Sequence, residues 1–215
     1  MYFDFLLFAI FAAVTWAVAS GGLWDAALMV FNVTFAGLVA MNFWEPLADW
    51  LEKSAPPLAG YADGIVVLVL FTVALLAIRT VVEYVSPGAI RFPGTLYFAG
   101  RWLFGAWTAA LVVGFVATVW QTAPLSETFL GVDPSKRTMF GLGPDRYWLA
   151  FTQRTSRYIL DREPAVPFDL RPLPPTAAGQ PVGGADFIVR YATRRAVYRK
   201  EITGPSVPGF SQTSQ

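Results

Sequence analysis

The sequence predicts an all-α membrane protein, with four transmembrane helices in a bundle and a partly ordered, basic C-terminal extension that contains many Pro and Gly residues. Two observations lead to this fold class. Of the 215 residues, 55% are hydrophobic and only 14% are charged, a balance outside the usual range of soluble domains. The apolar residues also gather in segments of about 20 residues or more, the length that a helix needs to cross a hydrocarbon core of about 30 Å.

Four such segments follow one another in the first part of the chain. The second is longer than a span requires and contains Pro46, so we expect its last turns to kink and lie near the membrane interface. The expected spans are Tyr2 to Ser20, Leu23 to Leu51, Gly64 to Tyr84 and Leu96 to Gln121.

The first segment also resembles a secretory signal, because Ala17-Val18-Ala19 could be cleaved by a signal peptidase. The residues before it, however, contain no Lys or Arg and do contain Asp4, unlike the positively charged start of a signal peptide. We therefore interpret it as a retained span, with a cleaved signal as the alternative.

The connections predict how the spans follow one another. Only Gly21 and Gly22 separate the first two spans, which predicts a tight antiparallel hairpin. The second and third connections, "EKSAPPLAGYADG" and "SPGAIRFPG", are rich in Pro and Gly and are expected to be surface loops.

The positions of Lys and Arg predict the orientation in the membrane. The third connection is bracketed by Arg79, Arg91 and Arg101, whereas the second has only Lys53. Because cytoplasmic connections carry the excess of Lys and Arg, the third connection is expected in the cytoplasm and both termini on the other side.

The chain beyond the spans divides into two parts. We expect a membrane domain over residues 1–125, a juxtamembrane segment over 126–162, and a Pro/Gly-rich linker with a basic tail over 163–215. In the juxtamembrane segment, Trp148, Phe151 and Tyr158 share one helical face. This pattern predicts an amphipathic helix, lying on the membrane surface or packed on the loops.

The basic tail is expected to be a short solvated segment that can contact anionic lipid. Its stretch "DFIVRYATRRAVYRKE" carries several Arg residues among aromatic ones, a pattern also found in nucleic-acid-binding segments. Nucleic acid is the less favoured partner.

The chain contains no Cys and no His, which excludes thiol nucleophiles, disulfides and imidazole acid–base catalysis. We therefore expect no catalytic residues, no metal site and no cofactor.

A few polar residues within the spans are candidates for contacts inside the membrane, where charges are costly. Arg79 and Glu83 stand four residues apart and can pair along one helix face. Snorkelling to the cytoplasmic surface explains Arg79 and Arg101; alternatively, one of them meets Asp25 across the bundle. The complete set is Asp25, Asn32, Arg79, Glu83 and Arg101.

Small residues recur at helical spacing in the fourth span, and such strips let two helices approach closely. They predict packing either within the bundle or between protomers. The set is Gly100, Gly105, Ala106, Ala109, Ala110 and Gly114.

The stretches "GGLWDAALMVFNVTFAGLVA" and "PGTLYFAGRWLFGAWTAALVVG", with a third span that ends near an Arg, resemble the colicin V production protein (CvpA) family of bacterial inner-membrane proteins. The resemblance covers roughly residues 1–125. It implies a four-span, oligomeric protein linked to colicin V production or export and to envelope stress. Some relatives carry a trypsin-like protease domain after the last span, but this chain has no His for a catalytic triad.

The expected function is that of a non-enzymatic membrane scaffold or oligomeric assembly. Two alternatives are a small channel or transporter subunit, with Asp25, Arg79 and Arg101 along a polar route, and an accessory subunit of a larger membrane complex.

Overall fold

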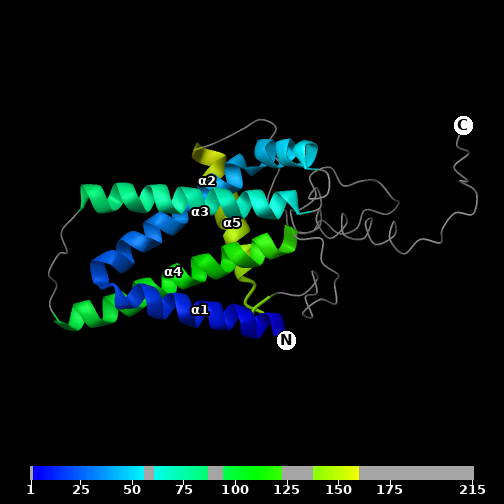
Figure 1. Cartoon of the computed structure of the whole chain (residues 1–215). Coiled ribbons are helices and arrows are strands. Elements are labelled where there is room, and N and C mark those ends of the chain that lie inside the picture. Colours follow the sequence, from blue (N-terminus) through cyan, green and yellow to red (C-terminus); the bar gives the residue numbers. More distant parts are fainter. Residues whose placement is uncertain (1, 56–60, 87–93, 123–137, 160–215) are drawn as a thin grey trace, which may run out of the picture.

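The structure, a computed structural model, describes residues 2–55, 61–86, 94–122 and 138–159. These residues form five α-helices (Figure 1). The predicted linker and basic tail over 163–215 lie outside the described residues, as do most of the loops. The helices are α1 (Tyr2–Ser20), α2 (Leu23–Ser54), α3 (Ala62–Val85), α4 (Gly94–Thr122) and α5 (Pro144–Ile159).

The first four helices are each long and apolar enough to cross a membrane. Their observed bounds lie within a few residues of the predicted spans. The prediction of an all-helical chain with four candidate membrane spans is therefore confirmed for the described residues.

Helices α1 to α4 run in alternating directions, so two ends of the bundle can be distinguished (Figure 1). The turn end holds the Gly21–Gly22 turn, the end of α3 and the start of α4. There the indole Nε1 of Trp24 donates a hydrogen bond of 3.2 Å to Ser86 Oγ. The α5 end holds the start of α1, the end of α4 and the start of α5.

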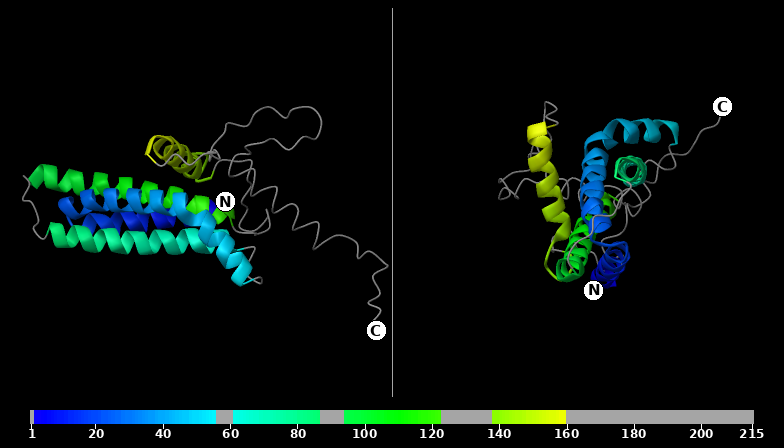
Figure 2. Two further views of the ribbon diagram at one scale, coloured as in Figure 1. Left: turned by 90° about the horizontal axis from the view of Figure 1, so that it is seen from above. Right: turned by 90° about the vertical axis from the view of Figure 1, so that its left-hand side faces the viewer.

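The first hairpin differs from the prediction, because α1 and α2 diverge after their turn instead of packing along each other. Helix α1 packs mainly on α4, helix α2 packs mainly on α3, and α2 and α4 form the central contact (Figure 2). Gly22 has φ 109°, a conformation that favours glycine. This backbone geometry allows α2 to diverge from α1 after the turn.

The last part of α2 turns aside from the bundle axis, as the sequence predicted (Figure 2). Pro46 lies inside this helix. Because proline has no N–H and its ring crowds the preceding turn, the helix bends there.

The core is continuous with α5, which crosses the side of the bundle (Figure 2). Phe115 of α4 stacks on Phe71 of α3, with ring centroids 4.1 Å apart, and meets Trp148 of α5 edge-on at 6.0 Å. A second cluster joins α1 to α4 through Phe3, Leu7 and Val113. Helix α5 is thus part of the folded unit and contributes to its core.

Candidate functional site

A cleft of about 310 Å³ lies between α1, α2 and α3 at the turn end. It is present because α1 and α2 diverge and because α1 and α3 make almost no contact with each other. Val18 from α1, Leu28 and Met29 from α2, and Val82 from α3 give it apolar walls.

Two polar side chains of α2 face this cleft, Asp25 and Asn32. They stand seven residues apart, about two helical turns, and so lie on the same face. Asp25, in the first turn of α2, is exposed, and Asn32 is only 4% exposed. Within the described residues, Asp25 forms no ion pair, so its carboxylate is available to a ligand.

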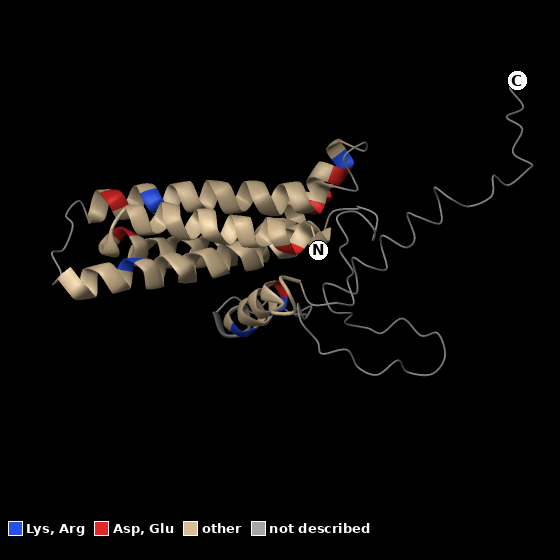
Figure 3. Ribbon diagram, turned by 90° about the horizontal axis from the view of Figure 1, so that it is seen from below, with Lys and Arg blue, Asp and Glu red and all other residues tan. Residues whose placement is uncertain are grey.

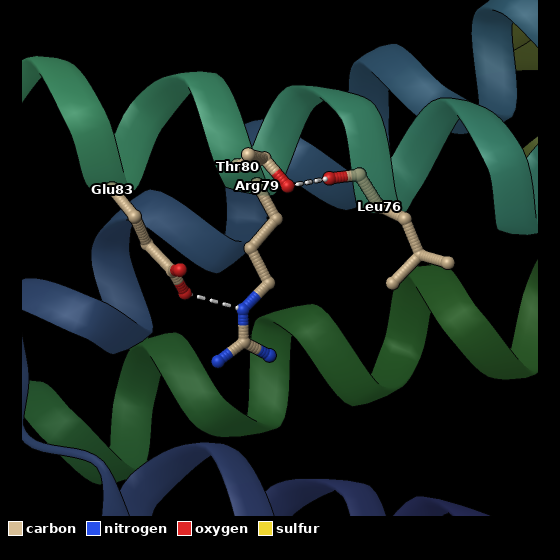
Figure 4. Close-up of polar contacts among 4 residues, drawn as sticks. All are labelled: Leu76, Arg79, Thr80 and Glu83. Atoms are coloured by element: carbon tan, nitrogen blue, oxygen red, sulfur yellow. Dashed lines mark hydrogen bonds and ion pairs between the residues drawn. The ribbon is translucent and has the colours of Figure 1, made fainter.

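Arg79 and Glu83 of α3 complete the polar lining. The Nε of Arg79 donates a hydrogen bond of 2.7 Å to Glu83 Oε1 (Figure 4). This contact realises the predicted pairing at four-residue spacing. The terminal Nη atoms of Arg79 make no hydrogen bond to any residue that the structure describes, and both side chains are about half exposed. The guanidinium therefore keeps its forked donor pair for another group.

Arg101 lies elsewhere, so the proposed meeting of Arg101 with Asp25 does not occur. Its guanidinium carbon is 5.0 Å from the centre of the Phe98 ring, within the range of a cation–π contact. Similar approaches to Tyr97 and Trp102 measure 5.9 and 5.7 Å. The aromatic residues around Arg101 on its own helix hold it away from the cleft.

Small residues of α4 pack against three different helices of the same chain. A Cβ added at Gly100 would lie 2.5 Å from Leu23 Cδ1 in α2, and one at Gly105 would lie 2.9 Å from the Thr15 carbonyl oxygen in α1. One at Gly114 would lie 2.8 Å from the Pro144 carbonyl oxygen in α5. The predicted strip is therefore three separate contact points within the protomer.

The alanines of the strip differ in exposure. Ala109 is buried, Ala106 is half-buried and Ala110 is exposed. Only Ala110 is therefore open to contact with lipid or a partner.

Helix α5 buries a different face from the predicted one. Trp148 is 3% exposed and Leu149 is fully buried, whereas Phe151 is 39% exposed. Trp148 fills the space beside Gly37 of α2, where a Cβ would clash with its ring. Trp148 therefore lies inside the bundle and not on its surface, because the glycines of α2 and α4 leave room for the indole there. The side chain of Tyr158 lies outside the described residues.

A buried carboxylate joins α5 to the end of α4. Asp145 is 1% exposed and accepts a hydrogen bond of 2.9 Å from Gln121 Nε2 and one of 2.7 Å from Thr138 Oγ1. The sequence interpretation missed this group. The sequence feature that could have revealed Asp145 is the Pro144-Asp145 pair, since Pro at the first helical position followed by an acidic residue is typical of a helix start.

Comparison with protein-family models, with curated proteins and with solved structures found no match for this chain. The described residues contain no group of three or more His, Cys, Asp or Glu side chains that could hold a metal ion.

Proposed function

We propose that this chain is a non-enzymatic scaffold in a bacterial inner membrane, of the colicin V production type, with a role in toxin production or export or in the envelope. The four apolar helices support the membrane location. The family assignment rests on the resemblance of the first 125 residues.

The distribution of charge is the observation that carries this proposal. Charged residues of α1 to α4 lie in two bands, one at each end of the bundle (Figure 3). In α2 no charged residue lies between Asp25 and Glu45, and in α3 none lies between Asp63 and Arg79. A broad uncharged band with apolar outer surfaces suits a protein that acts by contacting lipid and other membrane proteins.

The same distribution disfavours the alternative of a channel or transporter. Ionisable groups within the membrane that face the interior or a water-filled cavity often mark routes for ions or protons. Asp25 and Arg79 line a cleft at one end of the bundle, and Arg101 packs on aromatic rings instead of continuing that lining.

We further propose that the turn end faces the cytoplasm. Arg79 and Arg101 both lie at this end, and positive residues concentrate on the cytoplasmic side. An enzyme tag at the C-terminus that is active only outside the cytoplasm tests the orientation. A silent tag there, with activity for a tag inserted between α3 and α4, contradicts it.

Cross-linking tests the scaffold role, because the cysteine-free chain accepts single cysteines without background. Val73 of α3 is 60% exposed and Val67 is 1% exposed. A photoactivatable maleimide on Val73→Cys is expected to give a discrete cross-linked product in native membranes, and the buried control Val67→Cys is not. Val73→Cys and Leu76→Cys variants that both yield only free monomer contradict the scaffold.

Flux through reconstituted vesicles tests the channel alternative directly. A scaffold gives vesicles as tight as protein-free ones. A solute leak that disappears in Arg79→Leu replaces the scaffold proposal with a channel.

A further inference from the structure

We infer that the cleft at the turn end binds the headgroup of a phospholipid that carries a primary amine, such as phosphatidylethanolamine. This inference requires membrane insertion and does not rest on the scaffold role. The observations that carry it are the size and position of the cleft and its donors and acceptor that have no partner among the described residues.

The position of the cleft suits a headgroup. Its charged groups come from the first turn of α2 and the last two turns of α3, where the uncharged band of the bundle ends. Its two sides, α1 and α3, are not packed on each other, so the cleft is open toward the surrounding bilayer. A headgroup and the start of its acyl chains would meet the protein at this level.

Arg79 is the group that would bind the phosphate. Its Nε donates a hydrogen bond of 2.7 Å to Glu83 Oε1 (Figure 4), which restrains the orientation of the guanidinium. Its two Nη atoms make no hydrogen bond within the described chain and can donate to two phosphate oxygens. Such forked contacts are among the stronger hydrogen bonds in proteins.

Asp25 is the group that would bind the amine. Its carboxylate lines the same cleft and has no ion-pair partner among the described residues. A primary ammonium supplies three N–H donors, whereas a choline headgroup supplies none. The three charged side chains of the cleft carry a net charge of one negative unit, so an anionic headgroup without an amine would meet repulsion from Asp25 and Glu83.

The rest of the cleft suits the glycerol region. Asn32 lies two turns deeper than Asp25, among Leu28 and Met29, and its amide can bond an ester oxygen. The volume of about 310 Å³ is at the lower limit of small-molecule sites, about 300–1,000 Å³. The cleft is thus sized for a headgroup, with the acyl chains left outside.

An apolar track for those chains continues along α2. Phe35 and Val39 stand seven and eleven residues after Leu28, on the same side of the helix. They are 54% and 37% exposed. Acyl chains lying over these two residues would remain joined to a headgroup in the cleft.

Lipid retention by the full-length protein tests the inference. The protein is reconstituted in vesicles with equal amounts of phosphatidylethanolamine, phosphatidylcholine and phosphatidylglycerol, extracted in mild detergent, and analysed for bound lipid by native mass spectrometry. We expect about tenfold more phosphatidylethanolamine than phosphatidylglycerol, because an added charged hydrogen-bonded contact contributes about that factor. Equal retention of these two lipids overturns the inference, and retention of phosphatidylcholine equal to that of phosphatidylethanolamine overturns the role of Asp25.

Matched variants separate the cleft from general charge effects. Asp25→Asn is expected to abolish the preference for phosphatidylethanolamine, and Arg79→Gln is expected to lower the retention of all three lipids, because each of them carries a phosphate. Arg101→Gln removes an arginine at the same end outside the cleft, and Asp49→Asn removes an exposed carboxylate near the end of α2; both are expected to keep the preference and the amount of bound lipid. Thermal unfolding confirms that each variant is folded, and the site is refuted if the preference survives in folded Asp25→Asn protein or if folded Arg79→Gln protein retains as much lipid as the wild type.

Two further measurements exclude other occupants. Soluble glycerophosphoethanolamine at millimolar concentration is expected to leave the bound lipid in place; full displacement would assign the site to a soluble aminophosphate. A Leu28→Cys variant is expected to stay monomeric on oxidation in membranes. A disulfide-linked dimer would show that a second copy occupies the cleft.

Discussion

The two ends of the bundle use their carboxylates in opposite ways. At the α5 end, glycines and a carboxylate take part in internal packing. Trp148 lies against Gly114 and Gly37, and the buried Asp145 carboxylate accepts hydrogen bonds from two side chains. At the turn end, Gly21 lies beside a carboxylate that faces an open cleft.

The difference comes from the elements available at each end. Helix α5 supplies large side chains that fill the space between α2 and α4. At the turn end α1 and α3 make almost no contact with each other, and no described element covers the cleft between them. Polar side chains therefore take part in internal hydrogen bonds where a further helix packs on them, and they line an open cleft where none does.

The largest expected effect is at the α5 end. Trp148→Ala removes a buried indole and is expected to lower the free energy of unfolding by about 3–5 kcal/mol, measured by denaturant titration in detergent. The control is Tyr147→Ala, since Tyr147 is 71% exposed. Equal losses in the two variants would mean that α5 is not held by its buried face.

Overpacking the same contact is expected to have the next largest effect. Gly114→Leu places a side chain where even a Cβ would lie 3.1 Å from Trp148 Cβ, and about 1–3 kcal/mol should be lost. Faster proteolysis after α4 would report that α5 has detached. Ala110→Leu, one turn earlier and exposed, should change neither stability nor cleavage. If Gly114→Leu instead alters only the oligomeric state, this glycine serves contacts between protomers.

The buried carboxylate should contribute less than the indole. Asp145→Asn keeps the shape of the side chain but replaces one acceptor oxygen with a donor NH₂ group. The loss of one charged hydrogen bond is expected to lower the free energy of unfolding by about 1.5 kcal/mol. Thermal unfolding against Asp49→Asn, an exposed carboxylate, measures the difference. No difference between the two would indicate that water replaces the lost bond.

The smallest stability effect is expected at the turn end. Arg79→Gln breaks a half-exposed pair at four-residue spacing, worth about 0.2–0.5 kcal/mol. The free energy of unfolding should therefore stay close to that of the wild type while the amount of retained lipid falls. A large loss of stability would place Arg79 among the structural residues and would remove the contrast between the two ends.

Much of the fold could be predicted because the membrane imposes its own rules on length and polarity. Runs of apolar residues defined α1 to α4 to within a few residues, and Pro46 and Gly22 marked a bend and a turn. The divergence of α1 and α2 was not predictable, since helix partners depend on which surfaces fit best, and hydropathy does not encode that fit.

The site was predicted only in part. Asp25, Asn32, Arg79 and Glu83 were singled out as polar groups in apolar helices, and the structure brings all four to one cleft. Arg101 was grouped with them but lies on aromatic rings, and Asp145 was missed. Helical spacing gives neighbours along one helix, whereas contacts between helices depend on rotation and tilt.

The sequence by itself determined three features: four apolar helices, an uncharged band in the middle of these helices, and the absence of Cys and His side chains. These features follow directly from composition and from the length of the apolar segments, which decide whether a helix is stable in water or in a bilayer. The tertiary structure decided which glycines receive a neighbour, that α5 enters the core, and that a polar cleft remains between α1 and α3. These outcomes follow from packing, where the shapes of several distant segments must fit at once.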